Sequence, residues 1–461
     1  MISRKTFGSL TLSLILACGI TGRASAQTNE EAFEQFQWTV LSPGARAAAM
    51  GGVLLASANE PAAGLANPAG LRALTKPRVS VEFRSIDQRI ERHAAVDSLF
   101  TGSVTSFTDR LNDLSFVGGA MPLRRGRVIV GFARYKFLEY QTAFTLPPRA
   151  VPGVIGMARA FSPVDSRIDF QGVSYAASIA TAVGGRLWVG ATFSFDQLDV
   201  ALLNTRHDVQ VGVGTFDFTE LSLISNQSRI DHNAAGIGVT LGASYRPLDA
   251  VSIAIAFSKR PSFTVTENYD QDLTPATAGA GRATDRQQGP LLPASGFPKQ
   301  ISLDIPDQIS AGVELRPHRR IIAVFEGTYV RYSDLARGLT AVVAHDVLKS
   351  SDFQIDDAGE IHLGSEVNVG SDRNPVWLRG GVLTVADHRL RFVGDVQSGG
   401  NLTPAQSQRI NSLERARFNL GAHDTDLTGT VGAGIALGPR LSADVAYVWR
   451  KRLIVSVGAG F

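Results

Sequence analysis

The chain has 461 residues, of which 44% are hydrophobic and 19% charged, and its net charge is +3 at pH 7. Its mean hydropathy of +0.05 is too low for a helical membrane protein. After residue 26 no apolar run approaches the roughly 20 residues that a spanning helix needs. Mixed charges, without a basic stripe interleaved with aromatic residues, argue against nucleic-acid binding. If the protein lies in a membrane, it does so as strands.

The N-terminus has the layout of a secretory signal peptide. Residues 1–26 combine a basic start, an apolar stretch and the site Ala24-Ser25-Ala26, so we expect cleavage after Ala26. Cys18, the only cysteine, would leave with this peptide, and the mature chain would contain neither thiol nor disulfide. The alternative is a lipoprotein acylated on Cys18, which the bulky Leu16 two residues earlier disfavours.

A segment rich in alanine and glycine follows, over residues 27–77. Its small residues permit close approach between backbones. The turn at Asn67-Pro68 would fix its path, because an Asn side chain can hydrogen-bond the backbone two residues on and Pro restricts φ. A periplasmic linker is the alternative, although linkers are rarely this apolar. We therefore expect the segment to pack against the rest of the chain.

Alternation with period two recurs through the remaining residues. In 187–196 one face carries Leu, Val, Ala, Phe and Phe, and the other carries small or polar residues. Successive side chains of a strand point to opposite faces, so this pattern predicts strands with one apolar face. It returns in 236–245, 251–258, 427–437, 441–449 and 453–461. A β-sandwich would show the same alternation.

The connections separate the two architectures. Fourteen strands are expected near 78–86, 114–123, 127–140, 168–183, 187–200, 229–246, 251–268, 303–316, 321–334, 361–370, 376–386, 425–438, 440–450 and 453–461. Tight joins alternate with long ones, and the long ones are 87–113, 141–167, 201–228, 269–302, 335–360 and 387–424. An even number of antiparallel strands with short turns at one end is typical of a transmembrane β-barrel, whose short turns face the periplasm.

The strand ends agree with a barrel. Aromatic residues expected to form an interfacial girdle at the outer rim close several strands, and they are Tyr135, Phe137, Phe193, Phe195, Phe257, Tyr329, Tyr332, Tyr447 and Trp449. The last residue, Phe461, resembles the terminal aromatic by which outer-membrane barrels are recognised for assembly. Fourteen strands enclose a lumen too wide for side chains alone to fill. The sequence therefore predicts an all-β, transmembrane antiparallel barrel over 78–461, plugged by residues 27–77.

Two stretches resemble a known family. Gly44-Ala45-Arg46, Met50-Gly51-Gly52 and Asn67-Pro68-Ala69-Gly70-Leu71 resemble the N-terminal hatch of the FadL/TodX family of outer-membrane transporters. The run from Ile305-Pro306-Asp307 to Tyr332-Ser333 is similar to a strand–turn–strand segment of the same proteins. The resemblance implies a fourteen-stranded barrel with a hatch in the outer membrane of a Gram-negative-type bacterium.

The resemblance also implies a function. Such a barrel would be a passive channel for hydrophobic molecules such as long-chain fatty acids, without a cofactor or metal, and not an enzyme. Gating is expected from Gly51, Gly52, Asn67, Pro68, Ala69 and Gly70. The expected partners are membrane lipid, a hydrophobic ligand and, through Phe461, the barrel-assembly machinery. Relatives that act as partners in protein secretion or surface attachment supply the alternative, because Asn59-Glu60-Pro61 and Leu65-Ala66 depart from the transporter pattern.

One expected loop, 141–167, is unusually apolar. Its ligand-capture residues are expected to be Phe144, Leu146, Val154, Ile155, Met157 and Phe161. Apolar patches outside a core usually mark binding, although this loop could also fold over the barrel mouth and pack on its neighbours.

Other chemical motifs are weak. In His207-Asp208 and Asp231-His232 neighbouring side chains would point to opposite faces of a strand, and no nucleophile motif lies nearby. Residues 356–360 lack the alternate oxygen ligands of a calcium loop. The glycines at 432, 434 and 438 lie in an expected strand without a following helix, so we expect them to line the lumen.

Overall fold

The computed structural model describes Asn29, Phe33, Phe36, Gln37 and residues 43–57, 60–93, 104–146, 149–151, 159–161, 163–211, 218–272, 288–343, 348–371, 374–398, 402–419, 425–449 and 451–461. The expected signal peptide, 1–26, lies outside these residues. Among the helices so described, none combines the length and the apolar character needed to cross a bilayer.

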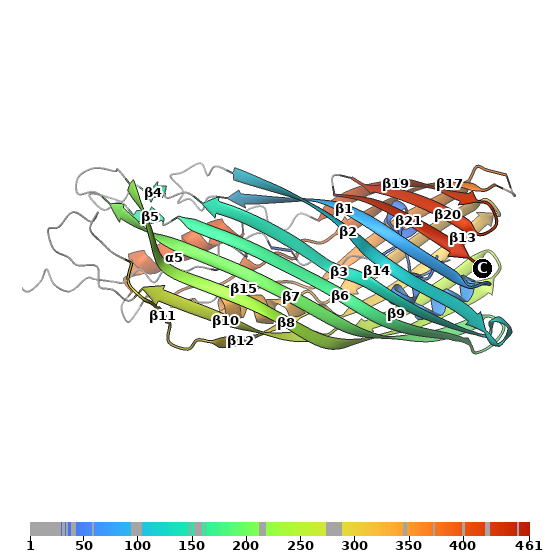
Figure 1. Ribbon diagram of the computed structural model, residues 1–461, viewed down its shortest axis with the longest axis horizontal. Coiled ribbons are helices and arrows are strands. Elements are labelled where there is room, and N and C mark those ends of the chain that lie inside the picture. The colour runs from blue at the N-terminus through green and yellow to red at the C-terminus, as the bar shows by residue number, and fades with distance from the viewer. Residues whose placement is uncertain are drawn as a thin grey trace, which may run out of the picture.

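The strands form one closed antiparallel barrel (Figure 1). Its wall consists of β1 (Arg78–His93), β2 (Val104–Leu123), β3 (Val128–Leu146), β6 (Val164–Ala182), β7 (Leu187–Val211), β8 (Phe218–Leu248), β9 (Val251–Lys259) with β10 (Ser262–Asp272), β12 (Lys299–Asp304) with β13 (Gln308–His318), β14 (Ile321–Val330), β16 (Ala358–Asn368), β17 (Val376–Val385), β19 (Asp426–Leu437), β20 (Leu441–Val448) and β21 (Arg452–Gly460). Pairing of β1 with β21, from Arg78↔Gly460 to Ile86↔Arg452, closes the sheet. The predicted fourteen-stranded barrel is confirmed.

The remaining elements lie inside the barrel or between its strands. They are α2 (Ala45–Ala49), α3 (Ala63–Ala66), η1 (Pro68–Ala73), η2 (Arg124–Gly126), β4 (Arg149–Val151), β5 (Arg159–Phe161), β11 (Leu291–Pro293), α4 (Ser333–Val343), η4 (Ser350–Asp352), β15 (Phe353–Gln354), β18 (Arg391–Phe392) and α5 (Pro404–Phe418). The helices α4 and α5 occupy connections that were expected to be long loops, 335–360 and 387–424.

The barrel is apolar on its outer face. In β9 the inward residues Ser252 and Ala254 are each 2% exposed, whereas the outward Ile253 and Ile255 are 45% and 54% exposed. The apolar residues of the alternating pattern therefore face the lipid, and the small or polar residues between them face the lumen. A small inward residue leaves room for backbone to pass close to the wall.

Several strands are longer than expected. β7 and β8 run for 25 and 31 residues, and their ladder continues to Val211↔Phe218, so most of the expected loop 201–228 is strand. The expected loops 87–113 and 141–167 are likewise shortened by β1, β2 and β3. Hairpin pairing continues as long as each backbone group finds a partner, and hydropathy does not report where it stops.

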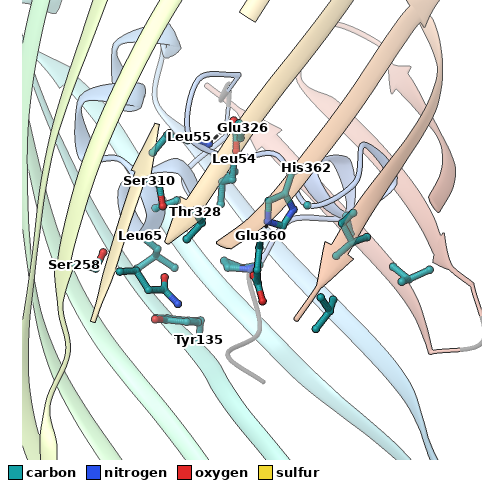
Figure 2. A pocket seen from close by; sticks show the side chains of 18 of the residues that line it. Leu54, Leu55, Leu65, Tyr135, Ser258, Ser310, Glu326, Thr328, Glu360 and His362 are labelled. Atoms are coloured by element: carbon teal, nitrogen blue, oxygen red, sulfur yellow. Dashed lines mark hydrogen bonds and ion pairs between the residues drawn. The ribbon is translucent and has the colours of Figure 1, made fainter. Parts of the chain in front are cut away.

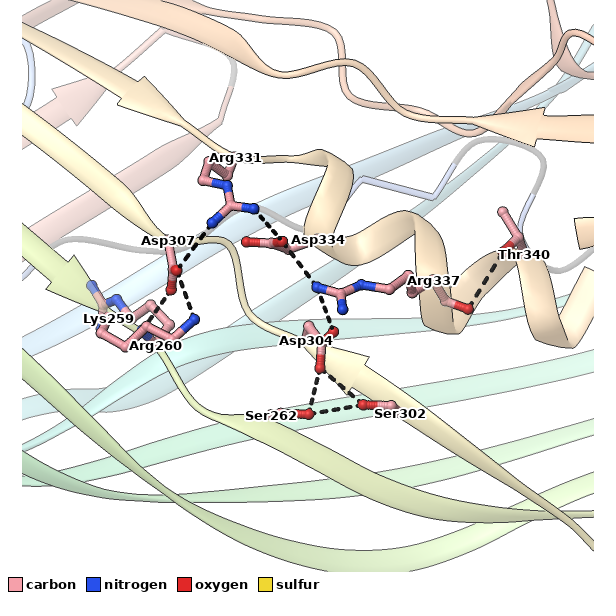
Figure 3. A network of polar contacts seen from close by, with 10 residues as sticks. All are labelled: Lys259, Arg260, Ser262, Ser302, Asp304, Asp307, Arg331, Asp334, Arg337 and Thr340. Carbon is pink, nitrogen blue, oxygen red and sulfur yellow. Dashed lines mark hydrogen bonds and ion pairs between the residues drawn. The ribbon is translucent and has the colours of Figure 1, made fainter. Parts of the chain in front are cut away.

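Two wall strands are broken where one strand each was expected, 251–268 and 303–316. β9 gives way to β10 at Arg260-Pro261, and β12 gives way to β13 at Ile305-Pro306-Asp307. Proline lacks the N–H that a ladder needs. Figure 3 shows the ion pairs that hold this region: Asp307 accepts from Lys259 Nζ at 2.7 Å and from the backbone N–H of Arg260 at 3.0 Å.

The same network reaches helix α4. Arg331 lies 3.6 Å from Asp307 and 3.4 Å from Asp334, and Arg337 lies 3.1 Å from Asp334 and 3.4 Å from Asp304 (Figure 3). The helix therefore is attached to both sides of the break in the wall.

The expected aromatic girdle is wrong at three residues. Tyr135, Phe137 and Tyr332 are buried, whereas the other aromatic residues assigned to it are exposed. The outward phase of β3 passes through Phe132, which is 68% exposed, so Tyr135 points into the barrel. The ladder from β3 to β6 shifts register between Lys136 and Leu138, and Phe137 occupies that bulge.

Candidate functional site

The N-terminal segment lies inside the barrel, near the end that carries the short turns and the C-terminus (Figure 1). We call residues 43–57 and 60–74 the hatch. Its helix α2 packs against β17, β19, β20 and β21, while η1 packs against β6, β7 and β8. The hatch therefore contacts wall strands from the middle of the chain and from its C-terminal part at the same time.

Asn67 holds the second turn of the hatch. Its Oδ1 accepts from the backbone N–H of Ala69 at 3.1 Å, which is the bond expected from the sequence, and its Nδ2 donates to the carbonyl of Leu55 at 3.0 Å. The turn lies in a notch of the wall. A Cβ added to Gly242 would come within 2.0 Å of Asn67 Oδ1, and one added to Gly190 within 2.8 Å of the Ala69 nitrogen.

The Met50-Gly51-Gly52 turn lies in a second notch. Gly51 and Gly52 have φ values of +76° and +83°, which side chains rarely permit. A Cβ on Gly381 would come within 2.3 Å of the Gly51 nitrogen, and one on Gly364 within 2.4 Å of the Met50 carbonyl oxygen. The close contacts explain the glycines of both partners.

Wall side chains bind the backbone of the hatch. The Glu326 carboxylate accepts from the N–H groups of Leu54, Leu55 and Ala56 at 2.9–3.0 Å. Thr430 accepts from the N–H of Gly51 at 2.9 Å, and its hydroxyl also lies 3.0 Å from the Ala49 carbonyl. Since irregular backbone at membrane depth needs polar partners, these contacts satisfy groups that the hatch cannot pair internally.

Arg46 links the hatch to a buried row of charges. Its Nε lies 2.8 Å from Glu366, which is also 2.7 Å from Arg379, and Arg379 is 2.7 Å from Asp444. Burial alone would lower the pKa of Arg46, but the Glu366 carboxylate outweighs burial and raises that pKa. Charges alternate along the row, so each buried group has an opposite neighbour.

Glu60 stands at the edge of this row. Its carboxyl is 7% exposed, and its Oε1 has no hydrogen-bond partner among the described residues. Burial raises the pKa of Glu60 to about 7, which the positive charge of Arg46 only partly opposes. The hatch therefore carries one carboxyl group that titrates near neutral pH.

A cavity of about 160 Å³ lies between the hatch and the inner wall (Figure 2). The labelled residues around it are Leu54, Leu55, Leu65, Tyr135, Ser258, Ser310, Glu326, Thr328, Glu360 and His362. Several of its polar groups bind the hatch or one another: His362 Nδ1 lies 2.7 Å from the Gly51 carbonyl, and Ser310 and Thr328 hydroxyls are 2.9 Å apart. The leucines of the hatch supply apolar surface.

Apolar side chains fill the lumen on the other side of the cavity. Phe33 and Phe36 pack edge to face at 5.7 Å, and Phe36 packs in the same way on Tyr140 and Phe170. Leu335, Leu339, Val342 and Val343 of α4 belong to the same buried cluster. The lumen thus contains a large buried apolar cluster beside a few buried polar groups such as Glu267 and Asn204, whereas a water-filled porin has a polar interior.

The wall is incompletely paired beside the cavity. β2 and β3 are hydrogen-bonded only from Leu123↔Val128 to Phe116↔Tyr135. Beyond this point β2 pairs with β1 alone and β3 with β6 alone. An ion pair between Asp113 and Lys136 spans the unpaired stretch. Tyr135, which lines the cavity, is the last residue of β3 that pairs with β2.

The expected ligand-capture residues do not form one loop in the described structure. Phe144 and Leu146 belong to strand β3, where Phe144 is buried and Leu146 half-buried. Phe161 belongs to the short strand β5. Val154, Ile155 and Met157 lie outside the described residues. The error at Phe144 arose because the hydrogen-bonded ladder between β3 and β6 continues to Leu146↔Val164, beyond the strand end expected from the sequence.

Part of the chain matches a known protein family. A family model described as outer membrane protein transport protein (OMPP1/FadL/TodX) matches residues 159–382. Over these residues the resemblance to the FadL/TodX family that the sequence indicated is confirmed. The matched residues include the run from Ile305 to Ser333 that resembled the family, while the hatch precedes them. The match to an outer-membrane family and the closed barrel together place the chain in the outer membrane of a Gram-negative-type bacterium.

Solved structures of the FadL/TodX type share the fold. The toluene transporter TbuX of Ralstonia pickettii is 13% identical, with a TM-score of 0.52 over 91% of this chain and 98% of its own. A Pseudomonas aeruginosa FadL homologue is 17% identical, with a TM-score of 0.55 over 93% and 99%. The CymD monoaromatic hydrocarbon channel is 14% identical, with a TM-score of 0.52 over 92% and 99%. No curated protein matches the chain in sequence.

The weaker motifs have structural roles in this FadL/TodX barrel. His207 bonds Asp165 at 2.9 Å across neighbouring strands. Among the described residues no group of three or more His, Asp or Glu side chains is placed to hold a metal ion. Of the three glycines in β19 and its turn, Gly432 faces the hatch at Ala49, whereas Gly438 lies in the turn with φ +81°.

Two features of the site were missed in the sequence. The first is a set of wall glycines, such as Gly190 and Gly364, that occupy inward positions in strands with alternating residues. A glycine at such a position indicates that another backbone passes close to the strand. The helix α4 also has an apolar face with helical period. It was missed because the sequence pattern assigns its residues to a strand at 321–334 and to the loop after it.

Proposed function

We propose that the protein is a channel for passive uptake of hydrophobic small molecules, gated by the hatch. The observation that carries the proposal is the large buried cluster of aromatic and aliphatic side chains in the lumen, some of which, such as Tyr135 and Leu65, also line the cavity at the hatch. A water-filled pore would expose polar side chains there. Partition of an apolar molecule into this interior needs no energy source beyond its concentration gradient.

The cavity favours molecules of the size of one aromatic ring. An apolar cavity of about 150 Å³ accommodates benzene in another protein, and the cavity here has about 160 Å³. TbuX and CymD, which share the fold, are respectively a toluene transporter and a monoaromatic hydrocarbon channel. A long-chain fatty acid would extend beyond this cavity, so its passage would require movement of the hatch or of α4.

The unpaired stretch between β2 and β3 supplies a route from the cavity into the membrane. Tyr135 lies both at the cavity and at the last backbone pair of the two strands. The Asp113–Lys136 ion pair bridges a stretch without a ladder, and two side chains part more easily than a row of backbone hydrogen bonds. A hydrophobic molecule would leave sideways without crossing water.

Uptake by proteoliposomes tests the proposal. Ser310→Phe would place an aromatic ring in the cavity, and we expect toluene uptake to fall close to the level of liposomes without protein. Ile309→Phe is the matched control, because Ile309 is the neighbouring residue on the lipid face and is 52% exposed. Both variants should retain heat-modifiable migration on gels. Normal toluene uptake by Ser310→Phe would exclude the cavity as the route, and absence of uptake by the wild type would favour docking of exported proteins.

A further inference from the structure

A second pocket lies at the opposite face of the hatch, among the short turns of the barrel. Its volume is about 590 Å³. Arg72 comes from the hatch, Arg186 from the β6–β7 turn, Arg246 from the end of β8 and Arg316 from the end of β13. Because short turns face the periplasm, this pocket opens at the periplasmic end. We call it the arginine pocket.

Positive charge in the arginine pocket exceeds negative charge. Its lining contains five arginines and two carboxylates. Two arginines have carboxylate partners, since Arg46 lies 2.8 Å from Glu366 and Arg316 lies 2.6 Å from Glu314. Arg72, Arg186 and Arg246 then face Asp249 alone. Three guanidinium groups against one carboxylate leave two positive charges.

Neutral groups bind the side chains of two of these three arginines. Arg72 donates to the Ser252 hydroxyl, and Arg186 donates to the Pro247 carbonyl. Among the described residues, Arg246 has no ion-pair partner. Burial, together with the positive charges of Arg246 and Arg316, lowers the pKa of Arg72 to about 10. Glu314 opposes these effects only in part, and the remaining positive charge indicates a place for an external anion.

Apolar side chains complete the lining. Trp188 and Ile322 border the same pocket and pack against the buried clusters of the barrel. A guanidinium group binds carboxylate and phosphate through paired N–H donors, whereas the indole ring and the isoleucine offer surface to hydrocarbon. The lining therefore combines the two parts of an amphipathic recognition site.

We propose that the arginine pocket binds an oxyanion, carboxylate or phosphate, carried on an amphipathic molecule at the periplasmic end of the barrel. The inference goes beyond the proposed uptake of hydrophobic molecules, because a neutral hydrocarbon has no use for the arginines. The two can therefore fail separately.

Tryptophan fluorescence measures this binding directly. In purified full-length protein, Trp38, Trp377 and Trp449 are replaced by Phe, so that Trp188 is the remaining reporter. The probes are octanoate, octyl phosphate, inorganic phosphate and octyl glucoside. We expect a saturable change in Trp188 fluorescence with octanoate or octyl phosphate, and the stronger of the two identifies the source of the oxyanion.

Paired variants assign the binding to the arginines. Arg72→Gln with Arg246→Gln should weaken the affinity at least about tenfold, since charge-assisted hydrogen bonds are lost. Arg124→Gln with Arg125→Gln, in the turn η2 at the same end of the barrel, removes the same charge and should leave the affinity unchanged. Arg246→Gln alone serves if the double variant does not fold. Toluene uptake should be unaffected by Arg246→Gln, which separates this inference from the transport proposal.

Three results would overturn the inference. An equal response to octyl glucoside would remove the role of the oxyanion. Inorganic phosphate bound as tightly as octyl phosphate would remove the role of the apolar part. Equal loss of affinity in the Arg124 and Arg125 control would replace the pocket by the general positive charge of the barrel end.

Discussion

Gly242→Ala should displace the hatch while leaving the barrel closed. The added Cβ would lie 2.0 Å from Asn67 Oδ1 and 3.0 Å from its Cγ, so the Asn67 side chain has to move. Its bonds to the N–H of Ala69 and to the carbonyl of Leu55 would then be lost. Gly242 pairs with Gly190 and Ala256 in the wall, and Ala can form the same backbone bonds.

The size of the effect follows from these contacts. Two hydrogen bonds contribute about 1 kcal/mol each, and forced packing in a filled interior costs about 1–3 kcal/mol. The substitution should therefore disfavour the seated hatch by about 3–5 kcal/mol. At 1.36 kcal/mol for each factor of ten, the unseated fraction would rise by about two to four orders of magnitude.

Hydrogen exchange and uptake together measure the change. In purified Gly242→Ala, amides from Asn67 to Leu74 should exchange faster than in the wild type, and toluene uptake should change if the hatch is the gate. Gly429→Ala is the matched control, because its added Cβ would meet no atom within 4 Å. Unchanged protection of the hatch in Gly242→Ala would refute the reasoning from close approach. Faster exchange with normal uptake would remove the hatch from the gating mechanism.

Three further predictions concern charge and assembly. The folded-state pKa of Glu60, about 7, lies above its ordinary value of 4.5. Its contribution of about 3 kcal/mol is therefore complete below pH 4.5 and is lost as pH rises through 7. The protection factors of the hatch amides, which compare each exchange rate with the intrinsic rate at the same pH, should fall from pH 6 to 8, and Glu60→Gln should abolish this fall. Asp307→Asn should lower the thermal stability of the barrel, by about 1–3 kcal/mol, because Lys259 and Arg331 lose their buried partner; an unchanged melting temperature would contradict this role. Removal of Phe461 should reduce the amount of heat-modifiable barrel in outer membranes, and a normal yield would exclude it as an assembly signal.

The wall could be predicted because each strand repeats a simple physical pattern. Residues such as Ile253 and Ile255 alternate with Ser252 and Ala254, and both faces follow from the period of the strand. The positions of strand ends could not be predicted, as Phe144 shows, because hydrogen bonding continues where the apolar pattern no longer signals it. Pro261 and Pro306 do mark the breaks in the wall, but the sequence does not tell that each pair of segments remains in one sheet.

The candidate site was only partly accessible in the sequence. The Asn67 turn was predicted from local chemistry, and its bond to Ala69 is present. The notch in the wall that holds this turn could not be predicted, because Gly190 and Gly242, which leave room for the turn, are distant from it in sequence. The arginine pocket could not be predicted for the same reason: its five arginines are far apart in the chain and meet only when the hatch and the turns of the barrel are brought to one end.

The contacts of α2 have a consequence for the order of biogenesis. This helix precedes every wall strand in the chain, yet it packs against β17, β19, β20 and β21, which are made last. In a chain that is synthesised from its N-terminus, α2 therefore cannot make these contacts until all strands from β1 to β16, and then its own partners, have been synthesised. The last strands therefore have two roles: β21 closes the barrel by pairing with β1, and β20 and β21 form part of the surface on which α2 packs. Closure of the wall and docking of the hatch in the lumen thus belong to the same late step.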